Sequence, residues 1–264
     1  MLKSIFFTIF LVLLFNACES GINSGELSTS SDSNLSAVDE NNSSSESNIT
    51  ISNKRLFLPA YFYDSELWQK VIDTNQSMIV VINPDNGAGD ESDSHYIQII
   101  DSLKSGDKMV IGYLNTEYAS RDIQDIKSEI DRWIELYPKI DGFFFDEVAV
   151  DDYRFYEDLF KYIKSKGDYF VALNSGTLPP DEYFLIADNV IVYESSVDGI
   201  GEDICKYPQK STIIAYNTPE DEMKSLIQNR DCEYFFFTDK DSGEAYMSLP
   251  SYFESEIETI YPKE

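Results

Sequence analysis

Short apolar runs recur along the chain from residue 56 onward, and most of them end in polar or aromatic residues. A run of four to eight apolar residues that stops abruptly is typical of a strand buried on both faces of a sheet. The runs start 20 to 34 residues apart, which leaves room for a connecting element in each interval. The predicted strands are Leu56–Tyr63, Met78–Asn83, Lys108–Leu114, Gly142–Asp146, Tyr169–Asn174, Asn189–Glu194, Ser211–Asn217 and Tyr234–Asp239.

Most of the intervals contain apolar residues at helical spacing. In Asp122–Tyr137 isoleucines recur every three or four positions together with Trp133, and this period predicts an amphipathic helix. The intervals around Glu182–Asp188 and Gly201–Tyr207 predict only short turns. The predicted helices are Ser65–Asp73, Ser94–Lys104, Asp122–Tyr137, Asp151–Lys166, Glu220–Asn229 and a closing helix over Glu244–Tyr261 that Pro250 interrupts.

Strands that alternate with helices predict a parallel sheet with right-handed crossovers. Eight such units in about 210 residues favour a closed (β/α)8 barrel of the TIM type over an open doubly wound sheet. Neither a Gly-x-Gly-x-x-Gly motif nor a phosphate-binding loop follows the first predicted strand, which argues against a nucleotide site. We therefore expect an α/β protein whose single barrel domain spans residues 55–264.

The first 54 residues read as a targeting segment and a linker. Lys3 precedes the apolar stretch Ile5–Phe15, which is too short to span a bilayer and is typical of a signal peptide over residues 1–17. Cys18 follows Ala17 as in a bacterial lipobox, and ordinary cleavage beside an incidental cysteine is the alternative. Residues 18–54 are rich in Ser, Asn and acidic side chains, which predicts a disordered stalk. We expect an exported protein of the cell envelope, lipid-anchored at Cys18.

The composition limits the classes of partner that the protein is expected to bind. The net charge of −28 repels nucleic acid and anionic membrane surfaces, and it suits a neutral or cationic ligand. We therefore expect no nucleic-acid partner, membrane contact through the N-terminal lipid alone, and a monomer. Cys205 and Cys232 would share a compartment that permits disulfides, and both a disulfide and two free thiols remain open.

The fourth and sixth predicted strands deliver carboxylates to one rim. Asp146 and Glu147 follow an aromatic run, and Glu194 ends the sixth strand. Parallel barrels place their chemistry at the carboxyl ends of the strands. Because alternate side chains face the barrel interior, Phe144 and Asp146 share one phase, as do Val190, Val192 and Glu194, so both acids are expected to face the barrel mouth.

A pair of acids at one rim is what a glycosidase needs, since one protonates the leaving oxygen and the other acts as nucleophile or base. We predict Asp146 as nucleophile or stabiliser and Glu194 as acid/base, with retention of configuration. Glu147 is out of phase with Asp146 and is expected to orient or tune the pair. The alternative is that these acids cap helices or form ion pairs.

The other predicted strands also end in residues suited to sugars. Tyrosine rings stack on sugar rings, while Asn, Asp and Thr side chains hydrogen-bond their hydroxyls. Each tyrosine taken singly is as consistent with packing as with ligand contact. The expected substrate-binding residues are Tyr61, Tyr63, Asn83, Tyr113, Asn115, Thr116, Asn174, Tyr216 and Asp239.

The sequence offers little for a metal or a cofactor, and we expect neither. The single histidine, His95, precedes a predicted helix in a polar loop, and no cysteine pair has zinc-ligand spacing. Two acidic groups fail to match a full calcium-loop pattern. They are Asp85, Asp90 and Asp93, and Asp239, Asp241 and Glu244.

Four motifs at the predicted strand ends occur in a fixed order. They are Asn83-Pro84-x-x-Gly87-x-Gly89, Gly112-Tyr113-x-x-Thr116-x-Tyr118, Asp141-Gly142-x-Phe144-Phe145-Asp146-Glu147 and Asn174-x-Gly176-Thr177. As an ordered set they resemble the spherulin 4 (spherulation-specific) family of polysaccharide-degrading barrels. Val190–Glu194 resembles that family's strand with a further acid. The family 114 polygalactosaminidases look like more distant relatives.

The resemblance implies endo-hydrolysis of an exopolysaccharide rich in galactosamine or N-acetylgalactosamine, with Asp146, Glu147 and Glu194 as the acids. A partly deacetylated polymer of this kind is cationic, which an acidic domain would attract. Biofilm remodelling or polymer processing during export would be the corresponding role. The competing hypothesis is a carbohydrate-binding or adhesion lipoprotein that keeps the barrel without hydrolysis.

Overall fold

The computed structural model describes residues 54–263 of the 264-residue chain. The predicted signal peptide, the lipidation site Cys18 and nearly all of the predicted stalk lie outside the described residues. Within residues 54–263, no helix has both the length and the apolar character needed to cross a membrane.

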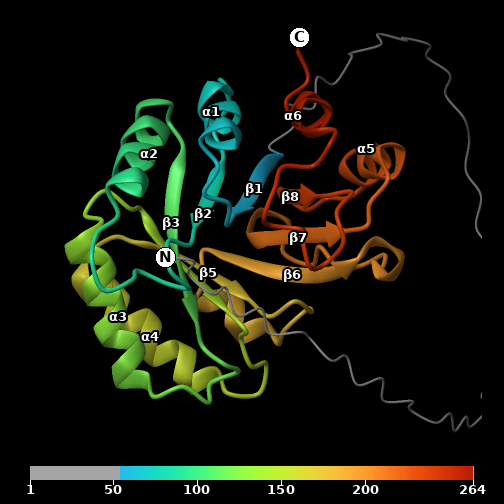
Figure 1. Ribbon diagram of the computed structural model, residues 1–264. Helices are drawn as coiled ribbons and strands as arrows, with labels where there is room; N and C mark the ends of the chain where they lie inside the picture. Colours follow the sequence, from blue (N-terminus) through green and yellow to red (C-terminus); the bar gives the residue numbers. More distant parts are fainter. Residues whose placement is uncertain (1–53, 264) are drawn as a thin grey trace, which may run out of the picture. The chain divides into compact units, whose positions relative to one another are not determined.

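Eight parallel strands close into a barrel in sequence order, which confirms the predicted TIM-type fold (Figure 1). Each strand pairs with the next one along the chain, and β8 pairs with β1 through Arg55↔Tyr234 and Leu56↔Phe235. The strands are β1 Arg55–Ala60, β2 Ile79–Ile82, β3 Met109–Asn115, β4 Gly142–Asp146, β5 Phe170–Asn174, β6 Asn189–Ser196, β7 Ser211–Tyr216 and β8 Tyr234–Phe237.

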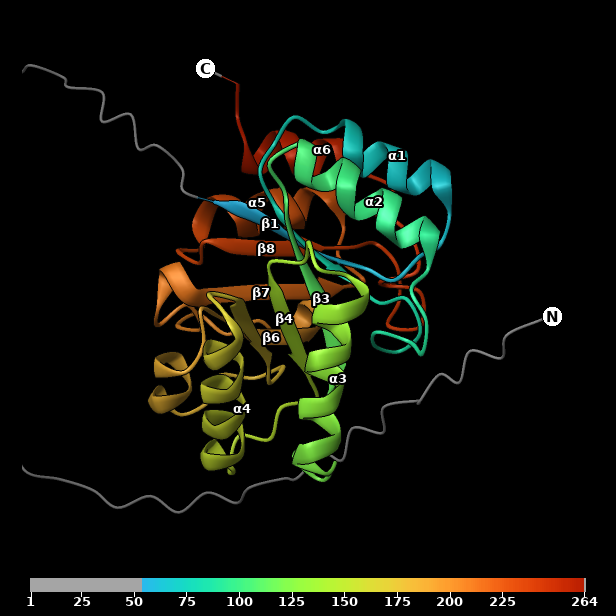
Figure 2. The same ribbon diagram turned by 90° about the vertical axis from the view of Figure 1, so that its left-hand side faces the viewer.

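The helices lie outside the strands and are unevenly distributed around them (Figures 1 and 2). Full α-helices follow β1 to β4, whereas only 3-10 turns follow β5 and β6, as the two weak intervals predicted. The α-helices are α1 Ser65–Asp73, α2 Ser94–Ser105, α3 Ile123–Leu136, α4 Tyr153–Lys166, α5 Glu220–Asn229 and α6 Phe253–Ile260. The 3-10 turns are η1 Asp181–Leu185, η2 Val197–Gly199 and η3 Pro208–Lys210.

An aspartate begins each of the first four helices. Asp64, Asp93, Asp122 and Asp152 are the N-caps of α1 to α4, and each carboxylate accepts a hydrogen bond from a backbone N–H of the first helical turn. Such a cap satisfies donors that have no partner within the helix. The side chains fix where each loop at the carboxyl rim ends and its helix starts.

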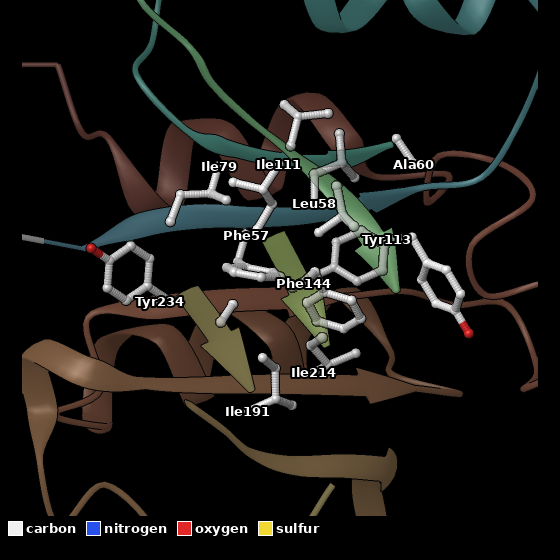
Figure 3. Close-up of a cluster of buried hydrophobic side chains, with 14 of the residues drawn as sticks. Phe57, Leu58, Ala60, Ile79, Ile111, Tyr113, Phe144, Ile191, Ile214 and Tyr234 are labelled. Carbon is white, nitrogen blue, oxygen red and sulfur yellow. The ribbon is translucent and has the colours of Figure 1, made fainter. Parts of the chain in front are cut away.

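Large apolar side chains fill the barrel interior. Phe57 of β1 and Phe144 of β4 meet across it with ring centroids 5.9 Å apart, and Ile191 and Ile214 belong to the same buried cluster (Figure 3). The interior is therefore a packed core, and ligands can approach only at its ends. The two tryptophans are buried on the helices, Trp68 on α1 and Trp133 on α3.

The phase predicted for β6 is wrong at Val190, because Ile191 rather than Val190 lies opposite Asn174 of β5. In the β6–β7 pairing Ile191 lies opposite Thr212 and Tyr193 lies opposite Ile213, so Val192 is an extra residue that has no partner. A β-bulge of this kind re-aims the side chains that follow it. Ile191 shares the interior face with Asn174 of the neighbouring strand, and the bulge brings Glu194 back to that face three residues later.

The predicted closing helix begins later than expected. Residues 244–252 form turns, and α6 covers only Phe253–Ile260. Pro250 lacks a backbone N–H and so cannot continue a helix through this segment. The consequence is a long loop after β8 at the same rim as the carboxylates.

A disulfide joins Cys205 to Cys232, with the two Cα atoms 5.0 Å apart. Cys205 precedes β7 and Cys232 precedes β8, so the bond lies at the amino ends of the strands. This rim is opposite the one that carries the acids, and the disulfide therefore acts on the scaffold alone.

Candidate active site

Asp146 and Glu194 lie together at the carboxyl rim of the barrel, at the ends of β4 and β6. The side-chain amide of Asn174, which ends the intervening strand β5, joins them. Its Nδ2 donates one hydrogen bond to Asp146 Oδ1 at 2.7 Å and a second to Glu194 Oε2. Since an amide nitrogen carries two N–H groups, Asn174 can serve both carboxylates at once.

Asp146 accepts three hydrogen bonds. Besides Asn174, the Tyr113 hydroxyl donates to Oδ2 at 2.9 Å and the backbone N–H of Glu147 donates to Oδ1 at 2.9 Å. Burial raises the pKa of Asp146 above its usual range, and the three donors oppose that shift because they stabilise the ionised form.

Glu194 accepts two side-chain hydrogen bonds, from Asn174 on Oε2 and from the Tyr246 hydroxyl on Oε1. Burial raises the pKa of Glu194 to about 7, the negative charge of Asp146 adds to the rise, and the two donors oppose it. Two interacting acids titrate as a pair, and the one with more donors loses its proton first. The site therefore favours an ionised Asp146 beside a Glu194 that keeps its proton up to about pH 7.

Glu147 has an unusual backbone conformation. Its φ of 53° lies in the left-handed region, which residues other than glycine seldom adopt. The buried Thr116 holds this turn, because its hydroxyl donates to the carbonyl oxygens of Asp146 and Glu147 at 2.9 and 2.7 Å. Burial and the charge of Asp146 raise the pKa of Glu147, and a hydrogen bond from Asn115 opposes the rise. Strain at such a residue often accompanies a functional site.

The rings of three tyrosines contact one another in a row that connects the two carboxylates. The ring of Tyr61 meets the rings of Tyr113 and Tyr246 edge to face, with centroids 5.5 Å apart in both pairs. Tyr113 donates to Asp146 and Tyr246 donates to Glu194, so the three tyrosines connect the two acids, as the Asn174 amide also does. Burial raises the pKa of all three hydroxyls, which keeps them protonated as hydrogen-bond donors.

The structure distributes the predicted substrate-binding residues unequally. Tyr61, Tyr113 and Asn174 surround the acids, and Asn115 contacts Glu147. The Thr116 hydroxyl contacts backbone carbonyls and Tyr156, which makes it a support for the turn.

Three other predicted residues form hydrogen bonds with rim loops instead of with the acids. Tyr63 is 58% exposed, and its hydroxyl donates to Asp93 at 3.2 Å. Asn83 accepts from the Gly87 N–H at 2.8 Å, and Asp239 accepts from the Ser251 N–H at 2.9 Å. Tyr216 ends β7 at the same rim and is half-buried.

Sequence reasoning missed Tyr246. It lies 52 residues from Glu194 along the chain, in a segment that its helical spacing assigned to the closing helix. The signal that could have located it is Pro250, because a helix interrupted there leaves the preceding residues in the loop after β8.

The side chains of the site are acids, amides and tyrosines. Within the part of the chain that the structure describes, no group of three or more His, Cys, Asp or Glu side chains is arranged to hold a metal ion. The single histidine, His95, packs against Tyr63 with ring centroids 4.3 Å apart, and its Nε2 lies 3.0 Å from the Tyr63 carbonyl oxygen.

Together, the fold and the site define a closed (β/α)8 barrel protein with a carboxylate pair at the ends of β4 and β6. Residues 55–260 match the model of spherulation-specific family 4, and the chain belongs to that family. Spherulin-4 from Physarum polycephalum is 26% identical over 232 residues, which cover 78% of this chain and 70% of that protein.

Two solved structures share the fold. The crystal structure of Sph3 from Aspergillus clavatus, determined in complex with GalNAc, matches with a TM-score of 0.70 at 21% identity, over 78% of this chain and 97% of that chain. A chitinase from Rhizomucor miehei matches with a TM-score of 0.50 at 10% identity, over 74% and 98% of the two chains. At these identities the likeness concerns the barrel itself.

Proposed function

We propose that this protein hydrolyses the glycosidic bonds of a polysaccharide rich in galactosamine or N-acetylgalactosamine, with Glu194 as general acid and base and Asp146 as nucleophile or stabiliser. The observation that carries the proposal is the shared donor Asn174, whose one nitrogen bonds an oxygen of each acid. One oxygen of each acid therefore lies within hydrogen-bond distance of the same nitrogen. The two acids are close enough for a single glycosidic bond to lie between them.

The shared donor also supports a retaining reaction. Two oxygens that accept from the same nitrogen can be no further apart than two hydrogen-bond lengths, or about 6 Å. Retaining glycosidases hold their carboxyl groups about 5–5.5 Å apart, and inverting enzymes hold them about 6.5–9.5 Å apart to admit a water molecule. The arrangement of Asp146 and Glu194 fits the shorter range.

The two steps of such a reaction follow from the protonation states. Protonated Glu194 gives its proton to the glycosidic oxygen as the bond to the anomeric carbon breaks. The Asp146 carboxylate bonds to that carbon or stabilises its positive charge. Glu194, now ionised, then takes a proton from the water that attacks the anomeric carbon, any bond from that carbon to Asp146 breaks, and both acids return to their starting states.

The substrate class rests on three supports. The chain belongs to spherulation-specific family 4, and Sph3, whose fold it shares, was crystallised with GalNAc. The net charge of −28 would attract a partly deacetylated, cationic polymer. The tyrosines of the site offer rings that can stack on a sugar.

We further propose export and a lipid anchor at Cys18. The disulfide between Cys205 and Cys232 supports an oxidising compartment, because such bonds are rare in proteins that remain in a reducing cytoplasm. Mass spectrometry of the mature N-terminus tests the anchor. A mature chain with unmodified Cys18 would contradict it.

A reducing-end assay over a panel of polysaccharides tests the activity, with polymer binding measured in parallel. We expect Asp146→Asn and Glu194→Gln to lower turnover by about 10²–10⁴ while the fold and polymer binding remain. Asp151→Asn and Glu182→Gln make the same chemical changes at exposed positions and serve as controls. Binding without turnover in the wild type would favour the carbohydrate-binding alternative. Proton NMR of the first product reports its anomeric configuration.

A further inference from the structure

The loop between β8 and α6 reaches back over the barrel mouth and places Tyr246 against Glu194. The Tyr246 hydroxyl donates to Oε1 of the carboxylate. The ring meets Tyr61 edge to face at 5.5 Å and lies 6.3 Å from the ring of Phe236. In addition, the Tyr246 carbonyl oxygen accepts from the Tyr61 N–H at 3.0 Å. Both ends of the residue are therefore fixed against the barrel.

Further contacts hold the rest of this loop. Asp239 accepts from the backbone N–H of Ser251 at 2.9 Å, and the Tyr252 hydroxyl donates to the Thr218 carbonyl oxygen at 2.8 Å. A loop held at both ends keeps its side chains in defined positions. The bond from Tyr246 to Glu194 is thus a feature of the folded scaffold.

The two side chains bonded to Glu194 differ in chemistry. The Asn174 amide nitrogen can only donate, so its bond to Glu194 is stronger when the carboxylate is ionised. A tyrosine hydroxyl can donate to a carboxylate and can also accept from a carboxylic acid. Tyr246 can therefore remain hydrogen-bonded to Glu194 in both of its protonation states.

We propose that Tyr246 is a positioning residue for proton transfer by Glu194, accepting from the acid before transfer and donating to the carboxylate after it. In the first step the Glu194 proton leaves its hydrogen bond to Tyr246 and passes to the glycosidic oxygen, and the Tyr246 hydroxyl turns to donate to the oxygen that has become charged. In the second step Glu194 regains a proton from water and the hydroxyl turns back. This inference rests on the proposed function of the pair.

Several other ionisable groups face Glu194. They come from four parts of the fold and are Asp146 of β4, Tyr113 of β3, Tyr61 after β1 and Tyr118 after β3. Asp146 opposes the ionisation of Glu194 by charge repulsion. The hydrogen bond from Tyr246 favours ionisation and lowers the pKa of Glu194, because it stabilises the charged carboxylate.

Tyr246→Phe removes the hydroxyl and keeps the ring. Without that donor the ionised form of Glu194 is less stable, so its titration should move to higher pH by about one unit. Carbon-13 NMR of glutamate-labelled protein measures this titration directly, with Glu194→Gln used to assign the resonance. The basic limb of the kcat/KM profile should move in the same direction while kcat falls about tenfold.

Tyr252→Phe is the matched control. It removes a buried tyrosine hydroxyl from the same loop, but the lost bond is to the Thr218 carbonyl oxygen. We expect it to leave the Glu194 titration within a few tenths of a unit of the wild type. An unchanged titration in Tyr246→Phe, or an equal shift in Tyr252→Phe, would overturn the proposal.

The NMR experiment separates this inference from the proposed function. If the wild type hydrolyses none of the polymers but Tyr246→Phe still shifts the Glu194 titration, the hydrogen bond acts as described and the reaction is wrong. If the wild type is active and the titration does not move, the reaction stands and Tyr246 is only part of the packing.

Discussion

Glu194 lies opposite Ile214 in the pairing of β6 with β7, on the face of the barrel that carries the interior side chains. The three-residue step from Ile191 to Glu194 would turn the acid outward in a regular strand, since side chains alternate with a period of two. The unpaired residue Val192 corrects the phase. Placement of the acid therefore depends on the length of the chain before it.

Deletion of Val192 tests this dependence. Removal of the extra residue should restore a regular β6 and turn Glu194 away from Asn174, and activity should fall at least a hundredfold. Val192→Ala keeps the chain length and serves as the control, with a cost of about 1–2 kcal/mol in stability from lost burial. Circular dichroism must first establish that the deletion variant is folded. A folded deletion variant with wild-type turnover would contradict the role of the bulge.

Asn174→Asp should disable the site without changing its shape. The substitution replaces a donor to both acids by a third negative charge between them, and like charges raise each other's pKa. We expect the upper apparent pKa of the pair to rise by a unit or more and turnover to fall at least a hundredfold. The measurement is the pH dependence of kcat/KM. Asn229→Asp adds the same charge on the exposed end of α5 and should leave the profile unmoved.

The raised pKa of Glu256 should make the free energy of unfolding decrease as pH rises. It is fully buried on α6, its Oε1 accepts from the Phe237 N–H at 2.8 Å, and burial raises its pKa from 4.5 to about 8. Between pH 4.5 and 8 the unfolded chain has lost this proton and the folded chain retains it. The folded state is therefore disfavoured progressively over that interval, by about 3 kcal/mol at pH 7.

Glu256→Gln removes this effect, because the amide stays neutral and keeps the acceptor oxygen. The difference in unfolding free energy between variant and wild type should grow in favour of the variant from pH 4.5 to pH 8. Urea unfolding at several pH values measures it. Glu254→Gln, exposed on the same helix, is the control. A difference that stays constant with pH would show that Glu256 titrates normally.

Loss of the disulfide should lower stability and spare the chemistry. The bond closes a segment of 27 residues, and the loop-closure estimate gives a loss of about 3–4 kcal/mol when both cysteines become serine. Because the bond lies at the rim opposite Asp146 and Glu194, kcat at low temperature should be unchanged. Thermal unfolding with and without reductant is the measurement. A double variant as stable as the oxidised wild type would contradict the expectation.

The barrel could be predicted from the sequence because every strand is a short apolar run, and runs such as Gly142–Asp146 and Asn189–Glu194 have clear ends. The rim positions of Asp146, Asn174 and Tyr113 follow from those ends. The bulge at Val192 could not be predicted, since a register shift depends on how two distant strands pair. The hydrogen bond from Tyr246 to Glu194 could not be predicted for a related reason. Nothing in the sequence of residues 244–252 indicates which acid that loop contacts.

The pairing of β1 with β8 closes the barrel through two residue pairs, between strands some 180 positions apart in sequence. Tyr261, next to the end of the described chain, reinforces this seam by accepting from the Leu56 N–H at 3.0 Å. Contacts between such distant segments form late in folding, because the intervening chain must first be ordered. Ribosomal synthesis would thus produce an open sheet first, which can close only when β8 has emerged.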